Sequence, residues 1–244
     1  MDQTDASSYL SHLDWELAWC KCTLCPELAK HRTYVIPGWG NPKSNIMLVG
    51  DKPDEEDDAA GYPFVGRVGN ILRVLLYYYA GLSDHEYFLD YVVMCRTARV
   101  AGGVLKPREP KAEEVKNCQE RLQGAIYTVD PTIIVALGPL ALRALTGEAG
   151  GITKTRGSVF TAKIPGVLTE SIMYPVLATY APSYLAVNTS KREVANGLWD
   201  QMKADLRLAT RLSDIMNEKY YGIPRPDREA LVEQRKEEAR AQDE

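Results

Sequence analysis

The cysteines are the residues of this chain whose spacing most readily suggests chemistry. Cys22 and Cys25 form a CxxC pair, Cys20 lies just before it, and Cys95 and Cys118 follow far downstream. A CxxC pair can bind zinc, hold an iron–sulfur cluster or exchange a disulfide, and the two distant cysteines could complete four thiolate ligands. The alternative is a set of unrelated buried thiols, which is the interpretation we favour for Cys20. The acidic, polar start of the chain is unlike an export signal, so we expect a cytoplasmic protein with few disulfides.

Carboxylates form the second candidate site. Asp51 follows an apolar run and opens the acidic segment 51–58. Carboxylates in general can orient water or stabilise positive charge that develops on a substrate. Lys52 is a candidate nucleophile if burial lowers its pKa, although a surface ion pair with a neighbouring carboxylate is the more ordinary interpretation. From composition alone, the whole segment is predicted to be a solvated acidic run.

The pattern of apolar residues indicates which elements position these groups. Short apolar runs predict four strands, at 45–51, 87–95, 131–138 and 171–180. Longer patterns predict helices at 70–82, 111–129, 139–147 and 192–212, and a further helix within 1–30. We interpret the Gly- and Pro-containing segments 51–69 and 97–110 as loops. Alternating strands and helices predict an α/β fold, a three-layer α/β/α arrangement with a central, mostly parallel four-stranded sheet.

Ligands of such sheets bind beyond the carboxyl ends of the strands. The site is therefore expected in four loops, which follow Gly50, Cys95, Gly138 and Tyr180. We assign residues 1–220 to one domain. Residues 221–244 form a charged tail, which is predicted to be a frayed helix or disordered.

Composition narrows the class of protein. The chain has 244 residues, of which 45% are hydrophobic and 25% charged, as in ordinary globular proteins. No stretch approaches the ~20 apolar residues that cross a bilayer, so we expect no membrane partner. The net charge of −4 does not indicate a nucleic-acid binder, which would need local clusters of cations. Local clusters of cations do occur, and the alternative to a phosphate-binding face is that they are ordinary solvated charges. They contain Lys30, His31, Arg32, Arg96, Arg99, Lys106, Arg108, Lys111, Lys154, Arg156, Lys191 and Arg192.

The order of motifs along the chain resembles the iron–sulfur uracil-DNA glycosylases of family 4. CxxCP is followed by NPKSNIMLVGDKPDEEDDAAGYPFVGRVGNIL, YVVMCR, a helix with a further cysteine, IIVALGPLAL, TKTRG and TYAPSYL. The resemblance covers roughly residues 18–205. PFVGRVG and the layout of four cysteines are specific, whereas IIVALG alone would be a weak signal.

The resemblance implies a cofactor, a partner and a base pocket. It implies that a [4Fe-4S] cluster with a structural role is held by Cys22, Cys25, Cys95 and Cys118. It implies that Phe64 stacks on a flipped-out pyrimidine of DNA, a contact of ~1–3 kcal/mol per base. Asp51 and Asp57 would act beside the scissile glycosidic bond. The matched base-binding motifs also contain Gly50, Lys52, Pro53 and Ser183. We expect the protein to act as a monomer.

Departures from the family pattern are concentrated at the residues that read uracil. The family's base-reading Asn is Tyr91, and a phenol cannot pair with both a carbonyl and an N–H of a pyrimidine. The His that would bond to the leaving base is Ala181, and losing such a donor typically lowers the rate by ~10²–10³. The Glu of the acidic motif is Asp51, and the loop after Cys95 is longer than usual. We therefore expect altered or weak uracil excision.

Three functions remain open at this point. The first is a glycosylase that flips a base from DNA, with changed specificity; a remodelled pocket for a C5-modified thymine or uracil is a variant of it. The second is a DNA-binding module without catalysis, which a Tyr91 ring in the place of the base would favour. The third is an iron–sulfur redox protein, which leaves PFVGRVG and the basic loops without a purpose.

Overall fold

The computed structural model describes residues 17–166, 170–188 and 192–242. Most of the helix predicted within 1–30 lies outside these residues. In the described part of that segment, a short helix, α2 (Pro26–His31), follows the CxxC turn. Among the described residues, no helix is long and apolar enough to cross a membrane.

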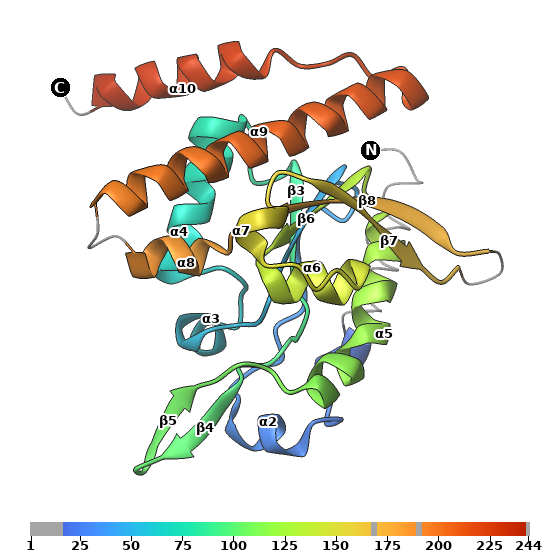
Figure 1. Cartoon of the computed structure of the whole chain (residues 1–244), viewed down its shortest axis with the longest axis vertical. Coiled ribbons are helices and arrows are strands. Elements are labelled where there is room, and N and C mark those ends of the chain that lie inside the picture. The colour runs from blue at the N-terminus through green and yellow to red at the C-terminus, as the bar shows by residue number, and fades with distance from the viewer. Residues whose placement is uncertain (1–16, 167–169, 189–191, 243–244) are drawn as a thin grey trace.

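A six-stranded sheet in the order β1-β3-β2-β6-β8-β7 forms the centre of the molecule (Figure 1). Its four inner strands are parallel and match the predicted four: β3 (Tyr87–Tyr91), β2 (Ile46–Gly50), β6 (Ile133–Leu137) and β8 (Ile172–Thr179). Two antiparallel edge strands were not predicted, β1 (Trp39–Gly40) and β7 (Val159–Ile164). β1 has only two residues, and β7 buries only alternate residues, so neither leaves a continuous buried apolar run in the sequence.

Helices cover both faces of the sheet, which confirms the α/β/α layers. Alternate residues of each inner strand face opposite sides: Met47 and Val49 pack with α5 (Ala112–Val129) and α6 (Pro139–Thr146). Ile46 and Leu48 pack in the second core with α4 (Gly66–Leu75), its π-helical continuation η1 (Leu76–Ala80), α8 (Pro182–Asn188) and α9 (Arg192–Tyr221). A short helix, α7 (Ile152–Thr155), precedes β7.

The two segments predicted as loops contain regular structure. Within 51–69 lies α3 (Glu55–Ala60), whose first turn is closed by a reciprocal capping box between Asp54 and Asp57. Within 97–110, β4 (Ala98–Ala101) and β5 (Val104–Pro107) form a separate hairpin. Gly102 and Gly103 connect its strands, both with positive φ, as a two-residue hairpin turn requires.

The charged tail contains a further helix, α10 (Arg228–Gln242), which lies alongside α9 (Figure 1). The Arg228 guanidinium bonds to the carboxylates of Glu86 and Asp214. The Arg235 guanidinium lies 4.0 Å from the centre of the Tyr77 ring in η1. α10 buries little apolar surface, so polar and cation–π contacts hold it against the body of the protein.

Candidate functional site

The predicted site residues gather where the inner strands end. β2 ends at Gly50 and β3 at Tyr91, and these two residues are neighbours in the parallel register. The loop after β2 leads through α3 to Phe64. After β6, Gly138 is the N-cap of α6. β8 ends at Thr179, two residues before Ala181. The carboxyl edge of the sheet therefore brings together residues that lie far apart in the sequence.

Phe64 and Tyr91 form a stacked aromatic pair. Their ring centres lie 4.6 Å apart and their planes differ by 21°. Phe64 is 4% exposed and Tyr91 3%. The backbone N–H of Phe64 donates to the Tyr91 hydroxyl at 3.0 Å. The Tyr91 ring thus covers a face of the aromatic side chain that was predicted to receive a base.

The Tyr91 hydroxyl is held from its other side by Asp57. It donates to Asp57 Oδ2 at 2.7 Å, and the same carboxylate accepts from the backbone N–H groups of Asp54 at 3.0 Å and Val65 at 2.8 Å. Burial raises the pKa of Asp57 and, together with the charge of Asp57, raises that of Tyr91 well above its usual value. Both oxygens of Asp57 are engaged with the protein, which leaves this carboxylate poorly placed to orient a water molecule.

Two glycines make room for this arrangement. A Cβ on Gly50 would lie 2.6 Å from the Phe64 ring and 3.0 Å from the Tyr91 ring. A Cβ on Gly69 would lie 1.5 Å from the Phe64 carbonyl oxygen, which also accepts from Arg73 Nη1 at 2.8 Å. Phe64 itself has a φ of +53°, which L-residues rarely adopt. The close contacts and the strained backbone therefore fix the position of the Phe64 side chain.

Asp51, Gly138 and Ala181 form a second group beside the stacked pair. Asp51 Oδ1 accepts from the backbone N–H of Ala141, in the first turn of α6, at 2.9 Å. A Cβ on Gly138 would lie 3.2 Å from Ala181 Cβ and 3.3 Å from Asp51 Oδ2. Burial raises the pKa of Asp51 to about 6, although the Ala141 N–H and the charge of Lys52 act in the opposite direction. The carboxylate is a cap on α6, and Ala181 brings no hydrogen-bond donor to it.

The four predicted cysteine ligands come from three separate segments. Cys22 and Cys25 lie in the turn before α2, Cys95 follows β3, and Cys118 lies on α5. Cys95 and Cys118 are buried in one hydrophobic core, against which Cys25 packs. Burial is the main cause that raises the pKa of Cys95 to about 11; Arg32 acts in the opposite direction, and Cys118 and Cys22 act in the same direction as burial. The thiols therefore influence one another across the space between these segments.

Polar side chains point at two of these sulfurs. Arg32 Nη1 donates to Cys95 Sγ at 3.1 Å, and Asn117 Nδ2 donates to Cys25 Sγ at 3.4 Å. Within the described ranges, no three His, Cys, Asp or Glu side chains are grouped for a single metal ion. The ligands of an iron–sulfur cluster bind different irons and are accordingly further apart than the ligands of one zinc ion. Among the described residues, the cysteines therefore do not form a mononuclear metal site.

Comparison with known protein families matches most of this chain. Residues 37–204 match the Uracil DNA glycosylase superfamily. This chain belongs to the uracil-DNA glycosylase superfamily. A Type-4 uracil-DNA glycosylase of Thermotoga maritima is 37% identical over 171 residues, 70% of this chain and 80% of that protein. One of Sulfurisphaera tokodaii is 33% identical over 177 residues, 71% and 74% of the two chains. A Type-5 uracil-DNA glycosylase of Pyrobaculum aerophilum is 30% identical over 196 residues, 71% and 83%.

The remaining predicted residues of the base-binding motifs lie near Asp51 or Ala181 in the sequence, and their burial and contacts differ. Pro53 is buried, and Ser183 is exposed on α8. Lys52 lies close enough to Asp51 to lower its pKa. Asp58, the last residue of the acidic segment, is structural, since its carboxylate accepts from the backbone N–H groups of Thr33 and Tyr34. The acidic run is therefore not solvated as a whole.

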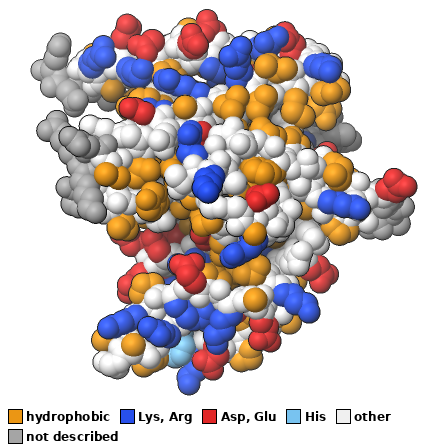
Figure 2. All heavy atoms as spheres, in the orientation of Figure 1, with side chains coloured by type: hydrophobic (Ala, Val, Ile, Leu, Met, Phe, Trp, Pro, Cys, Tyr) orange, Lys and Arg blue, Asp and Glu red, His pale blue; other side chains and the backbone are white. Residues whose placement is uncertain are grey.

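Several cations that we expected to contact DNA are engaged within the protein instead. Arg96 pairs with Glu55 at 3.1 Å, and Arg32 bonds to Cys95. Arg108 pairs with Glu114, and Arg156 pairs with Asp205. Lys191 and the side chain of Arg192 lie outside the described residues. Arg99 and Lys106 on the β4–β5 hairpin remain exposed, and Lys and Arg side chains gather over that lower part of the molecule (Figure 2).

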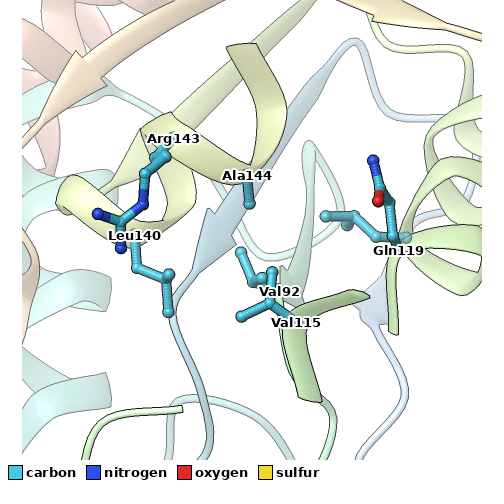
Figure 3. A pocket seen from close by; sticks show the side chains of 7 residues that line it. Val92, Val115, Gln119, Leu140, Arg143 and Ala144 are labelled. Carbon is cyan, nitrogen blue, oxygen red and sulfur yellow. The ribbon is translucent and has the colours of Figure 1, made fainter. Parts of the chain in front are cut away.

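A cavity of about 220 Å³ lies apart from the predicted site. Side chains of α5 and α6 face it from two sides, with Gln119 and Arg143 as its polar groups (Figure 3). Its other lining residues are Val92, Val115, Leu122, Leu140 and Ala144. It is smaller than typical small-molecule pockets, which are about 300–1,000 Å³, and no predicted site residue lines it.

Sequence reasoning missed a buried ion pair beneath the site. Arg121 Nη1 lies 2.5 Å from Asp90 Oδ1, both side chains are fully buried, and Arg121 Nη2 also donates to the Tyr91 carbonyl. The signal was present, because Asp90 interrupts an apolar strand and Arg121 lies on the same helical face as Cys118 and Leu122. Charged residues in such positions are almost always paired when buried.

The raised pKa of Asp51 predicts a specific dependence of stability on pH. The folded protein holds this proton more tightly than the unfolded chain, whose pKa is 3.8, so stability decreases as pH rises from 3.8 to about 6. Asp51→Asn removes that loss. We therefore expect the melting temperature of the variant minus that of the wild type to increase as pH rises from 3.8 to about 6, and to stay constant above pH 6. Thermal melts at several pH values test this, with Asp200→Asn, an exposed carboxylate, as the control. Parallel profiles for wild type and Asp51→Asn would contradict the prediction.

Proposed function

We propose that this protein binds DNA at the carboxyl edge of its sheet and that Tyr91 closes its base pocket, so that uracil excision is absent or very weak. The observation that carries the proposal is the Phe64–Tyr91 stack, locked by the hydrogen bond from Tyr91 to Asp57. Membership of the superfamily supports the DNA partner. The protein would then be a DNA-binding relative of the glycosylases.

The energetic argument concerns opening the pocket. A base can stack on the covered face of Phe64 only if the Tyr91 ring leaves it, which breaks the bonds to Asp57 and to the Phe64 N–H. Each buried hydrogen bond lost costs about 1–3 kcal/mol, and the aromatic pair contributes about 0.5–1.5 kcal/mol more. The total of about 2.5–7.5 kcal/mol lowers the population of the open pocket by ~10²–10⁵, since each 1.4 kcal/mol is about a factor of ten.

The chemistry is weakened independently of the pocket. Asp57 accepts from three donors and Asp51 Oδ1 accepts from the first turn of α6, which leaves fewer acceptor positions on both carboxylates to orient water. Ala181 offers no hydrogen bond to a departing base. The filled pocket also gives no support to a substrate with a bulky C5 group, which would need a larger space than uracil.

We also propose that Cys22, Cys25, Cys95 and Cys118 hold a [4Fe-4S] cluster. Their convergence, the burial of two of them, and the donors Arg32 and Asn117 aimed at two sulfurs support this assignment. Such a cluster supplies a covalent link rather than reaction chemistry: it would tie the α2 segment to the end of β3 and to α5.

Replacing one proposed ligand should remove the cluster. We expect Cys118→Ala to lose iron, acid-labile sulfide and the visible absorption of the cluster, and to melt at a lower temperature. Cys20→Ser is the matched control, because Cys20 is exposed and is not a proposed ligand. Equal iron contents in the two anaerobically purified variants would contradict the ligand set.

Two assays on the wild-type protein test the proposed function. Fluorescence anisotropy measures binding to duplex oligonucleotides, and base release is scored by cleavage of abasic sites in uracil-containing strands. Binding without abasic sites supports the proposal. Rapid uracil release would show that Tyr91 does not block the pocket, and absence of DNA binding would remove the proposed partner.

A further inference from the structure

The β4–β5 hairpin contributes no residue to the stacked aromatic pair or to the proposed cysteine ligands. It forms its own two-stranded sheet and, in the described part of the chain, pairs with no strand of the central sheet. It projects from the lower end of the molecule beside α2 (Figure 1). It begins just after β3, at the carboxyl edge of the sheet, so it extends outward from the face that we propose binds DNA.

The base of the hairpin is fastened to the domain. The Thr97 hydroxyl donates to the Arg108 carbonyl at 2.6 Å, and the Arg108 N–H donates to the Thr97 carbonyl at 3.1 Å. The Arg108 side chain pairs with Glu114 on α5, and Arg96 pairs with Glu55 on α3. The hairpin is therefore held in one direction by its base, while no salt bridge within the described residues neutralises the charge of its outer half.

The outer part combines cations with exposed apolar residues. Arg99 lies directly opposite Lys106, and both side chains are exposed; in the described structure neither forms an ion pair. Like charges placed opposite each other in a hairpin are destabilising on their own, so an external anion would relieve them. Nearer the turn, Val104 is 61% exposed on the face that carries this cationic pair, and Val100 is 59% exposed on the other face.

We propose that this hairpin enters the major groove of duplex DNA, with Arg99 and Lys106 on phosphates and the valines against base edges. The inference rests on the proposed DNA binding and goes beyond it by naming the contacting element. The major groove is about 12 Å wide and 8.5 Å deep and admits a two-stranded ribbon. Strands of four residues extend about 13 Å and lie about 4.8 Å apart, so the turn can reach the groove floor while the cations meet the phosphates at its rim.

The test compares the salt dependence of DNA binding. Each phosphate contact contributes about 0.9 to the slope of log K against log salt. We expect Arg99→Ala with Lys106→Ala to reduce that slope by about 2. The matched control is Lys163→Ala with Arg211→Ala. These two cations are exposed, but they lie toward the end of the sheet where the parallel strands begin. Lys163 pairs in register with Met173 near the start of β8, and Ser213, close to Arg211 on α9, bonds to Thr132 just before β6. This control should keep the wild-type slope.

A second variant examines the valines. We expect Val100→Ser with Val104→Ser to weaken duplex binding by about 3–10-fold with an unchanged slope, because only apolar contacts are lost. If the wild type binds duplex DNA and both hairpin variants bind equally well, the hairpin proposal is wrong while the proposed function survives. If the wild type binds no DNA, the proposed function itself fails. An equal effect of the variants on single-stranded oligonucleotides would overturn the assignment to a groove.

Discussion

Replacing Tyr91 by Asn and Ala181 by His should raise uracil excision by about 10²–10³-fold over the wild-type protein. The first change removes the ring that stacks on Phe64 and supplies an amide that can pair with a carbonyl and an N–H of the base. The second change places a donor beside Gly138 and Asp51, where Ala181 now lies. A donor to the departing base typically contributes this much to the rate.

Two further variants separate opening of the pocket from the chemistry. Ala181→His alone supplies the donor but keeps the Tyr91 ring over Phe64 and its hydroxyl bonded to Asp57, so we expect no gain in excision. Tyr91→Asn alone should improve the preference for uracil-containing over thymine-containing oligonucleotides without restoring the full rate. Should the folded double variant neither bind nor release uracil better than wild type, Tyr91 is not the obstacle and the match of these motifs to the family pattern is incorrect.

Breaking the Asp90–Arg121 pair should be the most destabilising single change near the site. Asp90→Asn leaves the guanidinium buried without its counter-charge, and such losses cost about 3–5 kcal/mol. Urea denaturation followed by tryptophan fluorescence measures the free energy of unfolding. The control is Glu55→Gln in the Arg96–Glu55 pair, where Glu55 is 78% exposed. Exposed pairs contribute less than about 1 kcal/mol, so this variant should remain close to wild type.

A double replacement tests the physical reason. Asp90→Leu with Arg121→Met removes both charges, and we expect it to be more stable than Asp90→Asn alone, because no unpaired ion is left in the core. Since Arg121 also donates to the Tyr91 carbonyl, Asp90→Asn should shift the position of Tyr91 as well. A loss of less than about 1 kcal/mol in Asp90→Asn would show that water reaches this pair.

Apolar runs and motifs are enough to predict the layered fold, the four parallel strands and the family. These follow from apolar runs that only a buried strand explains and from motifs such as PFVGRVG, whose glycines permit one local geometry. The departures at Tyr91 and Ala181 were also visible in the sequence, because a change of residue type at a matched position needs no coordinates. The buried pair of Asp90 and Arg121 left a signal that could have been used.

Tertiary structure alone decided what the departures do. Nothing in the sequence places the Tyr91 ring on Phe64 or its hydroxyl on Asp57, because that contact joins segments 27 and 34 residues apart through the packing of α3 against the end of β3. The same holds for Asp51, whose role as a cap depends on where α6 begins. The hairpin was hidden for a different reason: its strands are short and exposed, so they leave no buried pattern, and only the register of Arg99 with Lys106 shows that two cations share one face.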